Sequence, residues 1–145
     1  MRSAATVEAL QTALAAEHAA LHVYGFLGAR TSESGQPLVF AEIRDAYATH
    51  RTWRDLLTRK LVEAGAEPAP AAPSYELPTT PPTVAGVLLA ASDLEARCAE
   101  TYAYVVASTS SDDRRWAIGA LTRAAVRQVA YAEDPGPFPG APDLG

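Results

Sequence analysis

The side chains best suited to chemistry are Glu17, His50 and Glu95, because each interrupts a run of apolar residues at helical spacing. Glu17 lies in the middle of a seam that begins at Val7 and continues to Gly28. An unpaired carboxylate in a helical core is strongly destabilising, so Glu17 requires a partner cation, a raised pKa or a metal ion. The identity of that partner decides which kind of protein this is.

The second helical segment supplies candidate partners for Glu17. If residues 28 and 40 flank the turn of an antiparallel hairpin, Glu17 lies level with residue 51, between His50 and Arg54. Arg127, much later in the chain, is a further cation on a helical segment. We therefore expect Arg54 or Arg127 to neutralise Glu17 within a buried polar cluster. The expected members are Glu17, Tyr47, His50, Arg54, Glu95 and Arg127.

Two alternatives remain open. In one, Glu17, His50 and Glu95 bind iron, manganese or zinc, and an oxidoreductase activity becomes conceivable, because carboxylates and imidazoles ligate these metals. In the other, the seam is rotated so that Glu17 lies at the edge of the surface.

Three other residues have weaker signals. His18 and His22 are spaced like two zinc ligands on one helix face, but no third ligand can be assigned to that face, so we interpret them as packing residues. Cys98 is the only cysteine and is expected to be a small buried hydrophobic residue. No oxyanion hole or phosphate-binding loop is recognisable. We predict no catalytic residue and no cofactor, which favours a protein without enzymatic activity.

The prolines divide the chain into helices. All 11 fall at position 37, between 68 and 82, or from 135 onward. They cut the chain into three long proline-free stretches, and the turn-residue runs TSESGQ and STSSDD mark two further breaks. We therefore predict helices over 6–30, 38–64, 83–107 and 112–131, followed by a Pro/Gly-rich tail at 135–145. Thr6 and either Asp112 or Asp113 are the expected N-caps, and Gly65 the expected C-terminal cap.

The segment GAEPAPAAPSYELPTTPP, at 65–82, is too rich in proline for a helix. An extended chain advances about 3.1 Å per residue against 1.5 Å for a helix, so this segment can run the full length of a helical bundle. We predict one all-α domain over 1–145, a four-helix bundle with a long crossover between the second and third helices. In the last helix two apolar stripes compete: Trp116, Ala120, Arg123, Arg127 and Ala130, or Leu121, Ala125, Gln128 and Ala132.

Composition restricts the partners. The net charge is −5, and no run of Lys or Arg exceeds two residues, so nucleic acid is not an expected partner. No apolar stretch reaches the length of a signal sequence or a membrane span, which indicates a soluble, cytoplasmic protein without a membrane partner. Alanine-rich faces favour self-association, and we predict a homodimer.

Three stretches carry a resemblance to known proteins: AAEHAALHVYG at 15–25, RDAYATHRTWRDLL at 44–57 and PFPG at 137–140. With them the whole chain resembles the ferritin-like superfamily, and within it a family of uncharacterised ferritin-like domains from high-GC bacteria. The resemblance implies a ferritin-like four-helix bundle and no established activity.

The resemblance also implies where metal ligands belong. Di-iron members carry a Glu on two helices and Glu-x-x-His on the other two. Glu17 matches the first Glu and Glu95 can match the third-helix Glu, but the second helix has Tyr47-x-x-His50 and the fourth has arginines. Because arginine cannot ligate a metal, we expect a degenerate di-iron site replaced by an ion pair. The expected function is a metal-free binding or interaction module.

Overall fold

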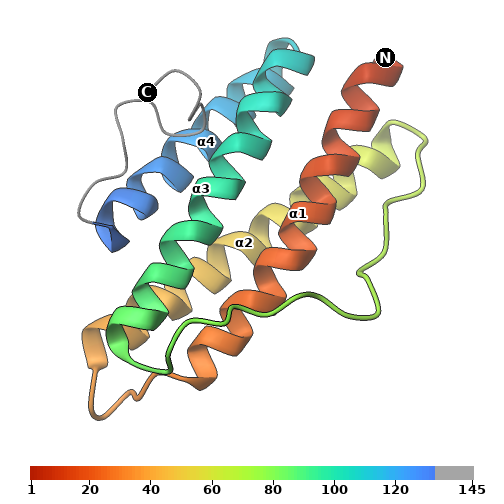
Figure 1. Ribbon diagram of the computed structural model, residues 1–145. Coiled ribbons are helices and arrows are strands. Elements are labelled where there is room, and N and C mark those ends of the chain that lie inside the picture. The colour runs from red at the N-terminus through yellow and green to blue at the C-terminus, as the bar shows by residue number, and fades with distance from the viewer. Residues whose placement is uncertain (133–145) are drawn as a thin grey trace.

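The computed structural model describes residues 1–132, and over that range the chain is all-α, without a strand (Figure 1). The helices are α1 (Ala4–Ala29), α2 (Pro37–Glu63), α3 (Val84–Ser108) and α4 (Ser111–Tyr131). Each begins and ends within a residue or two of the bounds expected from the prolines. The tail expected at 135–145 lies outside the described residues, as does the PFPG stretch.

Two of the expected N-caps are corrected. Ser3 caps α1, because its hydroxyl accepts the backbone N–H of Thr6 at 3.2 Å and places Thr6 inside the first turn. Ser110 is the N-cap residue of α4, although its side chain makes no capping hydrogen bond. Asp112 and Asp113 lie in the first turn of that helix, where carboxylates interact favourably with the helix dipole.

The ends of α2 and α3 follow from local chemistry. Pro37 occupies the first turn of α2, where its missing N–H is not needed, and Gly65 follows the helix with a φ of +74°. The hydroxyl of Thr83 caps α3 by accepting the N–H of Gly86 at 3.1 Å. A Cβ at Gly86 would lie 1.9 Å from the carbonyl oxygen of Pro81, so only glycine lets the crossover approach the helix this closely.

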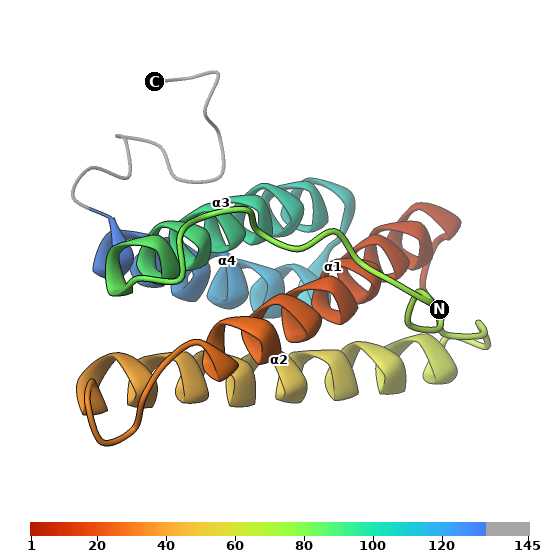
Figure 2. The same cartoon turned by 60° about the horizontal axis from the view of Figure 1, so that its bottom comes forward.

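The helices form two hairpins, α1 with α2 and α3 with α4, which meet mainly through α1 and α3 (Figure 2). Residues 64–83 lead from the end of α2 to the start of α3 along the length of the bundle, as Figure 1 shows. As a result α2 and α3 run in the same direction, whereas α1 and α3 are antiparallel.

Side chains of α1 hold the crossover in place. Gln11 accepts the N–H of Ala69 at 2.9 Å, and His18 Nε2 lies 3.0 Å from the Ala69 carbonyl oxygen. The rings of His22 and Tyr75 are 5.3 Å apart. His18 and His22 thus pack against the crossover.

The apolar core consists of two halves, one on either side of a polar level at mid-height. Alanines line much of both halves, which lets the helices approach closely. The half near the α1–α2 turn includes Leu27, Ile43 and Leu94, and the half near the N-terminus includes Leu10, Leu57 and Val105.

The buried face of α4 agrees with neither expected stripe. It shares only Ala120 with the first stripe and nothing with the second. An alanine-rich helix has little contrast between its faces, so its sequence period does not determine the buried side. The buried residues are Asp113, Ala117, Ala120, Ala124 and Tyr131.

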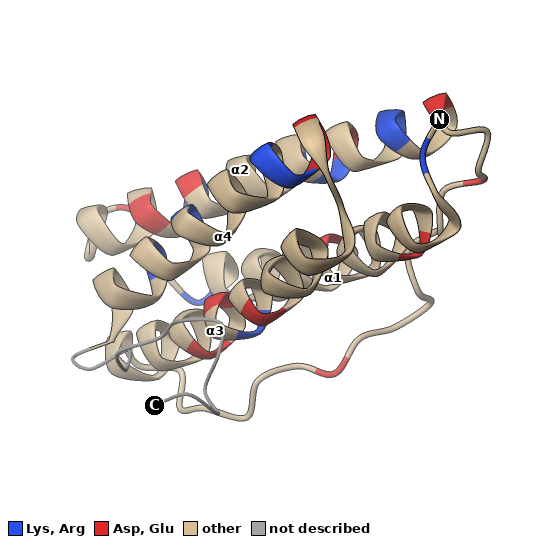
Figure 3. Ribbon diagram, turned by 90° about the horizontal axis from the view of Figure 1, so that it is seen from above, with Lys and Arg blue, Asp and Glu red and all other residues tan. Residues whose placement is uncertain are grey.

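In residues 1–132 no helix combines the length and apolar character that a membrane span needs. Lys and Arg positions are interspersed with Asp and Glu positions along the helices (Figure 3). The surface therefore presents both signs of charge.

Candidate functional site

Glu17, His50 and Glu95 come from α1, α2 and α3 and meet between the two halves of the core. All three are fully buried. His50 Nδ1 lies 2.6 Å from Glu17 Oε2, and His50 Nε2 lies 2.9 Å from Glu95 Oε1. A ring that donates from both nitrogens is an imidazolium, so His50 joins α1 to α3 as a cation between two carboxylates.

Two tyrosines donate to the same carboxylates in a reciprocal pattern. Tyr24 follows Glu17 on α1 at the same interval at which Tyr102 follows Glu95 on α3. The interval is two helical turns, so each tyrosine shares a face with its own glutamate. Because α1 and α3 are antiparallel, Tyr24 donates to Glu95 Oε1 and Tyr102 to Glu17 Oε1, each at 2.5 Å. The bonding pattern is therefore approximately two-fold symmetric about His50.

Aromatic rings enclose the imidazole. Tyr24 is stacked on His50 with ring centroids 5.3 Å apart, and Trp53 approaches His50 edge-on at 5.2 Å. Trp53 in turn contacts Tyr102 at 5.4 Å and Trp116 at 6.5 Å. These rings exclude water, which strengthens the electrostatic interactions inside the cluster.

This environment fixes the protonation of its groups. Burial by itself lowers the pKa of His50, but the charges and hydrogen bonds of Glu17 and Glu95 outweigh it and raise the pKa to about 9. Burial, reinforced by the carboxylates, raises the pKa of Tyr24 and Tyr102 well above its usual value. At neutral pH the imidazole is charged and both phenols are hydrogen-bond donors.

Tyr47 and Arg54, which the sequence places in this cluster, lie elsewhere. Tyr47 is 37% exposed and points along the outside of the α1–α2 pair, near Gly25. Arg54 pairs with Asp55 at 2.8 Å on the surface of α2. Both residues occupy the expected helix, but their angular position on α2 turns them away from Glu17.

Arg127 is also corrected as a partner of Glu17. Its Nη2 donates to Thr49 Oγ1 at 2.8 Å, which ties α4 to α2 instead. Its guanidinium is partly buried near Tyr131. Burial raises the pKa of Tyr131, and the charge of Arg127 lowers that pKa again in part. A fully buried guanidinium would lose its hydration, and this position avoids part of that penalty.

The centre of the bundle is consequently short of positive charge. Within residues 1–132, His50 is the only basic side chain that pairs with Glu17 or Glu95. As ionised groups, two carboxylates and one imidazolium leave one negative charge without a protein cation. Such a charge is costly in an environment that excludes water.

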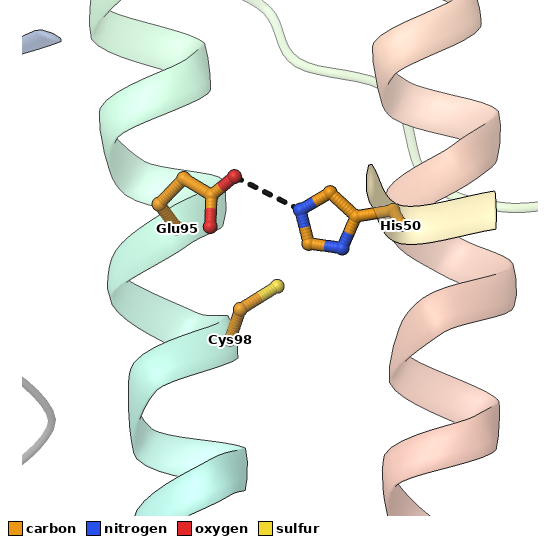
Figure 4. A group of neighbouring side chains, drawn as sticks. All are labelled: His50, Glu95 and Cys98. Carbon is orange, nitrogen blue, oxygen red and sulfur yellow. Dashed lines mark hydrogen bonds and ion pairs between the residues drawn. The ribbon is translucent and has the colours of Figure 1, made fainter. Parts of the chain in front are cut away.

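Cys98 is a neighbour of this cluster that the sequence interpretation did not include. Donor atoms of His50, Glu95 and Cys98 all lie within 4.8 Å of one another (Figure 4). Cys98 is one turn after Glu95 on the same face of α3, which is the signal that the sequence offered. Glu95 Oε2 is buried and has no hydrogen-bond partner among residues 1–132. Burial raises the pKa of the Cys98 thiol well above its usual value.

These observations define an all-α four-helix protein with a buried Glu–His–Glu cluster. The chain belongs to a family described as a domain of unknown function (DUF4439), which matches residues 9–143. It is similar to the crystal structure of a conserved hypothetical protein, rv2844, from Mycobacterium tuberculosis, with 32% identity and a TM-score of 0.81. That similarity covers 90% of this chain and 97% of the mycobacterial one. No curated protein matches the chain.

Proposed function

We propose that this protein is a ferritin-like bundle that binds one metal cation within the Glu17–His50–Glu95 cluster. Two features support the ferritin-like assignment: the hairpins are joined by a crossover as long as the bundle, and Glu17 and Glu95 occupy corresponding places in their hairpins. The cation binding is supported by the charge of the cluster.

The donor set does not fit the two metal ions of the di-iron members. Such a pair needs bridging carboxylates and an imidazole for each ion. Here α2 carries the exposed Tyr47 where a glutamate would be required, and Arg127 of α4 cannot ligate a metal. His50 and Glu95 offer donor atoms close enough together to hold a single ion, and Glu17 holds the Nδ1 side of His50.

One observation carries the proposal: two fully buried carboxylates share one protein cation. The two arginines expected to supply a second positive charge have other partners: Arg54 pairs with Asp55, and Arg127 donates to Thr49. A divalent cation would remove the charge imbalance and also use the unpartnered oxygen of Glu95.

The test is metal analysis of protein purified without chelator. We expect close to one equivalent of metal in the wild type, its loss in Glu17→Ala and its retention in Glu8→Ala, which removes an exposed carboxylate from the same helix. Because Glu17→Ala can also unfold, the stripped wild type is titrated with Zn²⁺, Mn²⁺ and Fe²⁺ while its thermal midpoint is measured. Binding raises the midpoint. A wild type that holds no metal and gains no stability from any of these ions contradicts the proposal.

The second candidate is a metal-free binding or interaction module, and a specific observation favours it. Both nitrogens of His50 are already hydrogen-bonded to carboxylates, so a metal must displace the Nε2 proton before the ring can ligate. In this alternative the cluster serves only to fix the packing of α1, α2 and α3. The negative outcome of the titration would select it.

Homodimer formation and a cytoplasmic location remain predictions. Exposed apolar residues on α4, Ile118 and Val129, support self-association through the outer face of this helix. Sedimentation of the wild type and of Ile118→Glu tests this, with a monomeric wild type as the contradicting result.

A further inference from the structure

The metal-binding proposal, if correct, leaves open which atoms hold the ion. Three candidate donors come from α2 and α3: a ring nitrogen of His50, a carboxylate oxygen of Glu95 and Cys98 Sγ, which all lie within 4.8 Å of one another. In Figure 4 the side chains of Glu95 and Cys98 extend from α3 toward the imidazole ring of His50. Tetrahedral zinc with bonds of about 2.0–2.3 Å places its ligand atoms roughly 3.5 Å apart, so only small side-chain movements are required.

The unpartnered oxygen of Glu95 indicates that this space lacks a positive group. Glu95 Oε1 accepts hydrogen bonds from Tyr24 and His50, but Oε2 accepts none from the described part of the chain although the side chain is fully buried. Buried carboxylate oxygens without a donor are rare and costly. A cation bound between Glu95 and Cys98 would supply the missing interaction.

Glu17 is placed to support such a ligand set without joining it. It accepts from His50 Nδ1, which leaves Nε2 as the nitrogen directed at Glu95. Metal-bound histidines commonly donate their other N–H to a carboxylate, which fixes the tautomer and the orientation of the ring. Tyr102 holds Glu17 in turn through its other oxygen.

Sulfur determines the class of ion. Thiolate ligands select zinc and similarly thiophilic ions, whereas Mg²⁺ and Ca²⁺ prefer sites made of oxygen alone. A groove of about 290 Å³ between α1, α3 and the crossover is lined in part by Cys98, Val23 and Tyr75, and it offers an entry path.

We propose that His50, Glu95 and Cys98 are the protein ligands of a mononuclear zinc-class site, and that Glu17 positions His50. Binding of the ion releases the Nε2 proton of His50 and the thiol proton of Cys98 to solvent. This rests on the proposed function above, and it adds a sulfur ligand to it. Three protein ligands leave one coordination position for a further small ligand.

The experiment titrates the stripped, reduced protein with Co²⁺ and follows its absorption spectrum. The absorption change should saturate at one equivalent of Co²⁺ and include a near-ultraviolet sulfur-to-cobalt charge-transfer band. Addition of Zn²⁺ should displace the cobalt and remove this band. Cys98→Ala should abolish the charge-transfer band and weaken Zn²⁺ binding at least about tenfold.

Glu-to-Gln variants separate ligands from the positioning residue. Glu95→Gln should weaken the site as Cys98→Ala does, and Glu100→Gln, an exposed carboxylate on the same helix, should leave the spectrum unchanged. Glu17→Gln should retain the charge-transfer band, shift its energy and lower affinity by roughly tenfold to a hundredfold. An unshifted band at wild-type affinity would refute the positioning role.

X-ray absorption at the zinc edge of the wild type requires no variant to fold. A sulfur neighbour at about 2.3 Å supports the site, and a shell of nitrogen and oxygen alone overturns it. Metal bound without sulfur would refute this ligand set and leave the proposed function intact. Absence of any bound metal would refute both.

Discussion

Two clusters of charge connect the helices, and they differ in their balance of sign. At the end of the bundle Asp113 accepts from Arg2 Nε and from Lys60 Nζ, each at 2.7 Å. This end cluster has two cations for two carboxylates, because Arg2 also lies 3.8 Å from Glu63, and the side chains around Asp113 keep some contact with solvent. The central cluster has two carboxylates for one cation, and it is fully buried.

The difference reflects where a long cationic side chain can be placed. Arg2 and Lys60 reach Asp113 while their stems lie along the surface and their heads remain partly hydrated. At mid-height the groups that reach the carboxylates are a compact imidazole and two phenols. In the end cluster protein cations match the carboxylates in number. In the central cluster one carboxylate has no protein cation within the described residues.

The strongest way to break the central cluster is to remove its only cation. In protein stripped of metal, His50→Leu leaves two carboxylates facing each other and should lower the free energy of unfolding by about 3–5 kcal/mol. Urea denaturation measures this. His18→Leu, which loses one bond to the crossover, is the matched control and should cost only about 1 kcal/mol. Equal losses in the two variants would contradict the central role of His50.

The two clusters should respond to pH in opposite directions. The pKa of His50 is raised from 6.5 to about 9, so its contribution is complete below pH 6.5 and is lost as the pH rises to 9, by roughly 3 kcal/mol. At Asp113 burial raises the pKa, but Arg2 and Lys60 lower it by more. That contribution is present above the ordinary value of 3.8 and is lost as the pH falls below it.

Denaturation of the stripped wild type across this range, compared with His50→Leu, measures the alkaline loss. The loss should vanish in the variant. A wild type of constant stability between pH 6.5 and 9 would contradict a charged His50.

The reciprocal tyrosines provide a sharper test of the central cluster. Tyr24→Phe and Tyr102→Phe each remove one hydrogen bond to a buried carboxylate, and each should destabilise by about 2 kcal/mol. Similar values are expected because the two bonds are equivalent in kind: each joins a buried phenol to a buried carboxylate oxygen. Tyr104→Phe, at a 42% exposed position on α3, should change stability by less than about 0.5 kcal/mol. A large effect for only one of the two buried tyrosines would disprove the equivalence.

The smallest effect is expected at the end cluster. Asp113→Asn should cost about 1 kcal/mol, since its ion pairs are partly hydrated, and the cost should shrink in high salt. Unfolding at low and high ionic strength checks this, and a salt-independent loss would indicate that hydrogen bonding rather than charge holds this end together.

Much of the fold was predictable, because the prolines punctuate it. They mark the start of α2, the end of α2 and the start of α3, whereas turn residues follow α1 and separate α3 from α4. The proline-rich segment has the length to become a crossover. Counting along helical seams also selected Glu17, His50 and Glu95, the residues that meet. Counting along the seams did not identify the partners of Arg54 and Arg127. It gives the height of a residue along its helix, but not the direction in which a long side chain extends.

The sequence by itself determined the four helices and the level at which a carboxylate interrupts the core. Only the tertiary structure decided which groups neutralise it. The antiparallel pairing of α1 with α3 sends each tyrosine to the glutamate of the other helix and brings Cys98 beside His50. Helical periodicity is a local property that any short stretch of sequence carries, whereas the charge of a buried site depends on side chains that arrive from helices far apart in the chain.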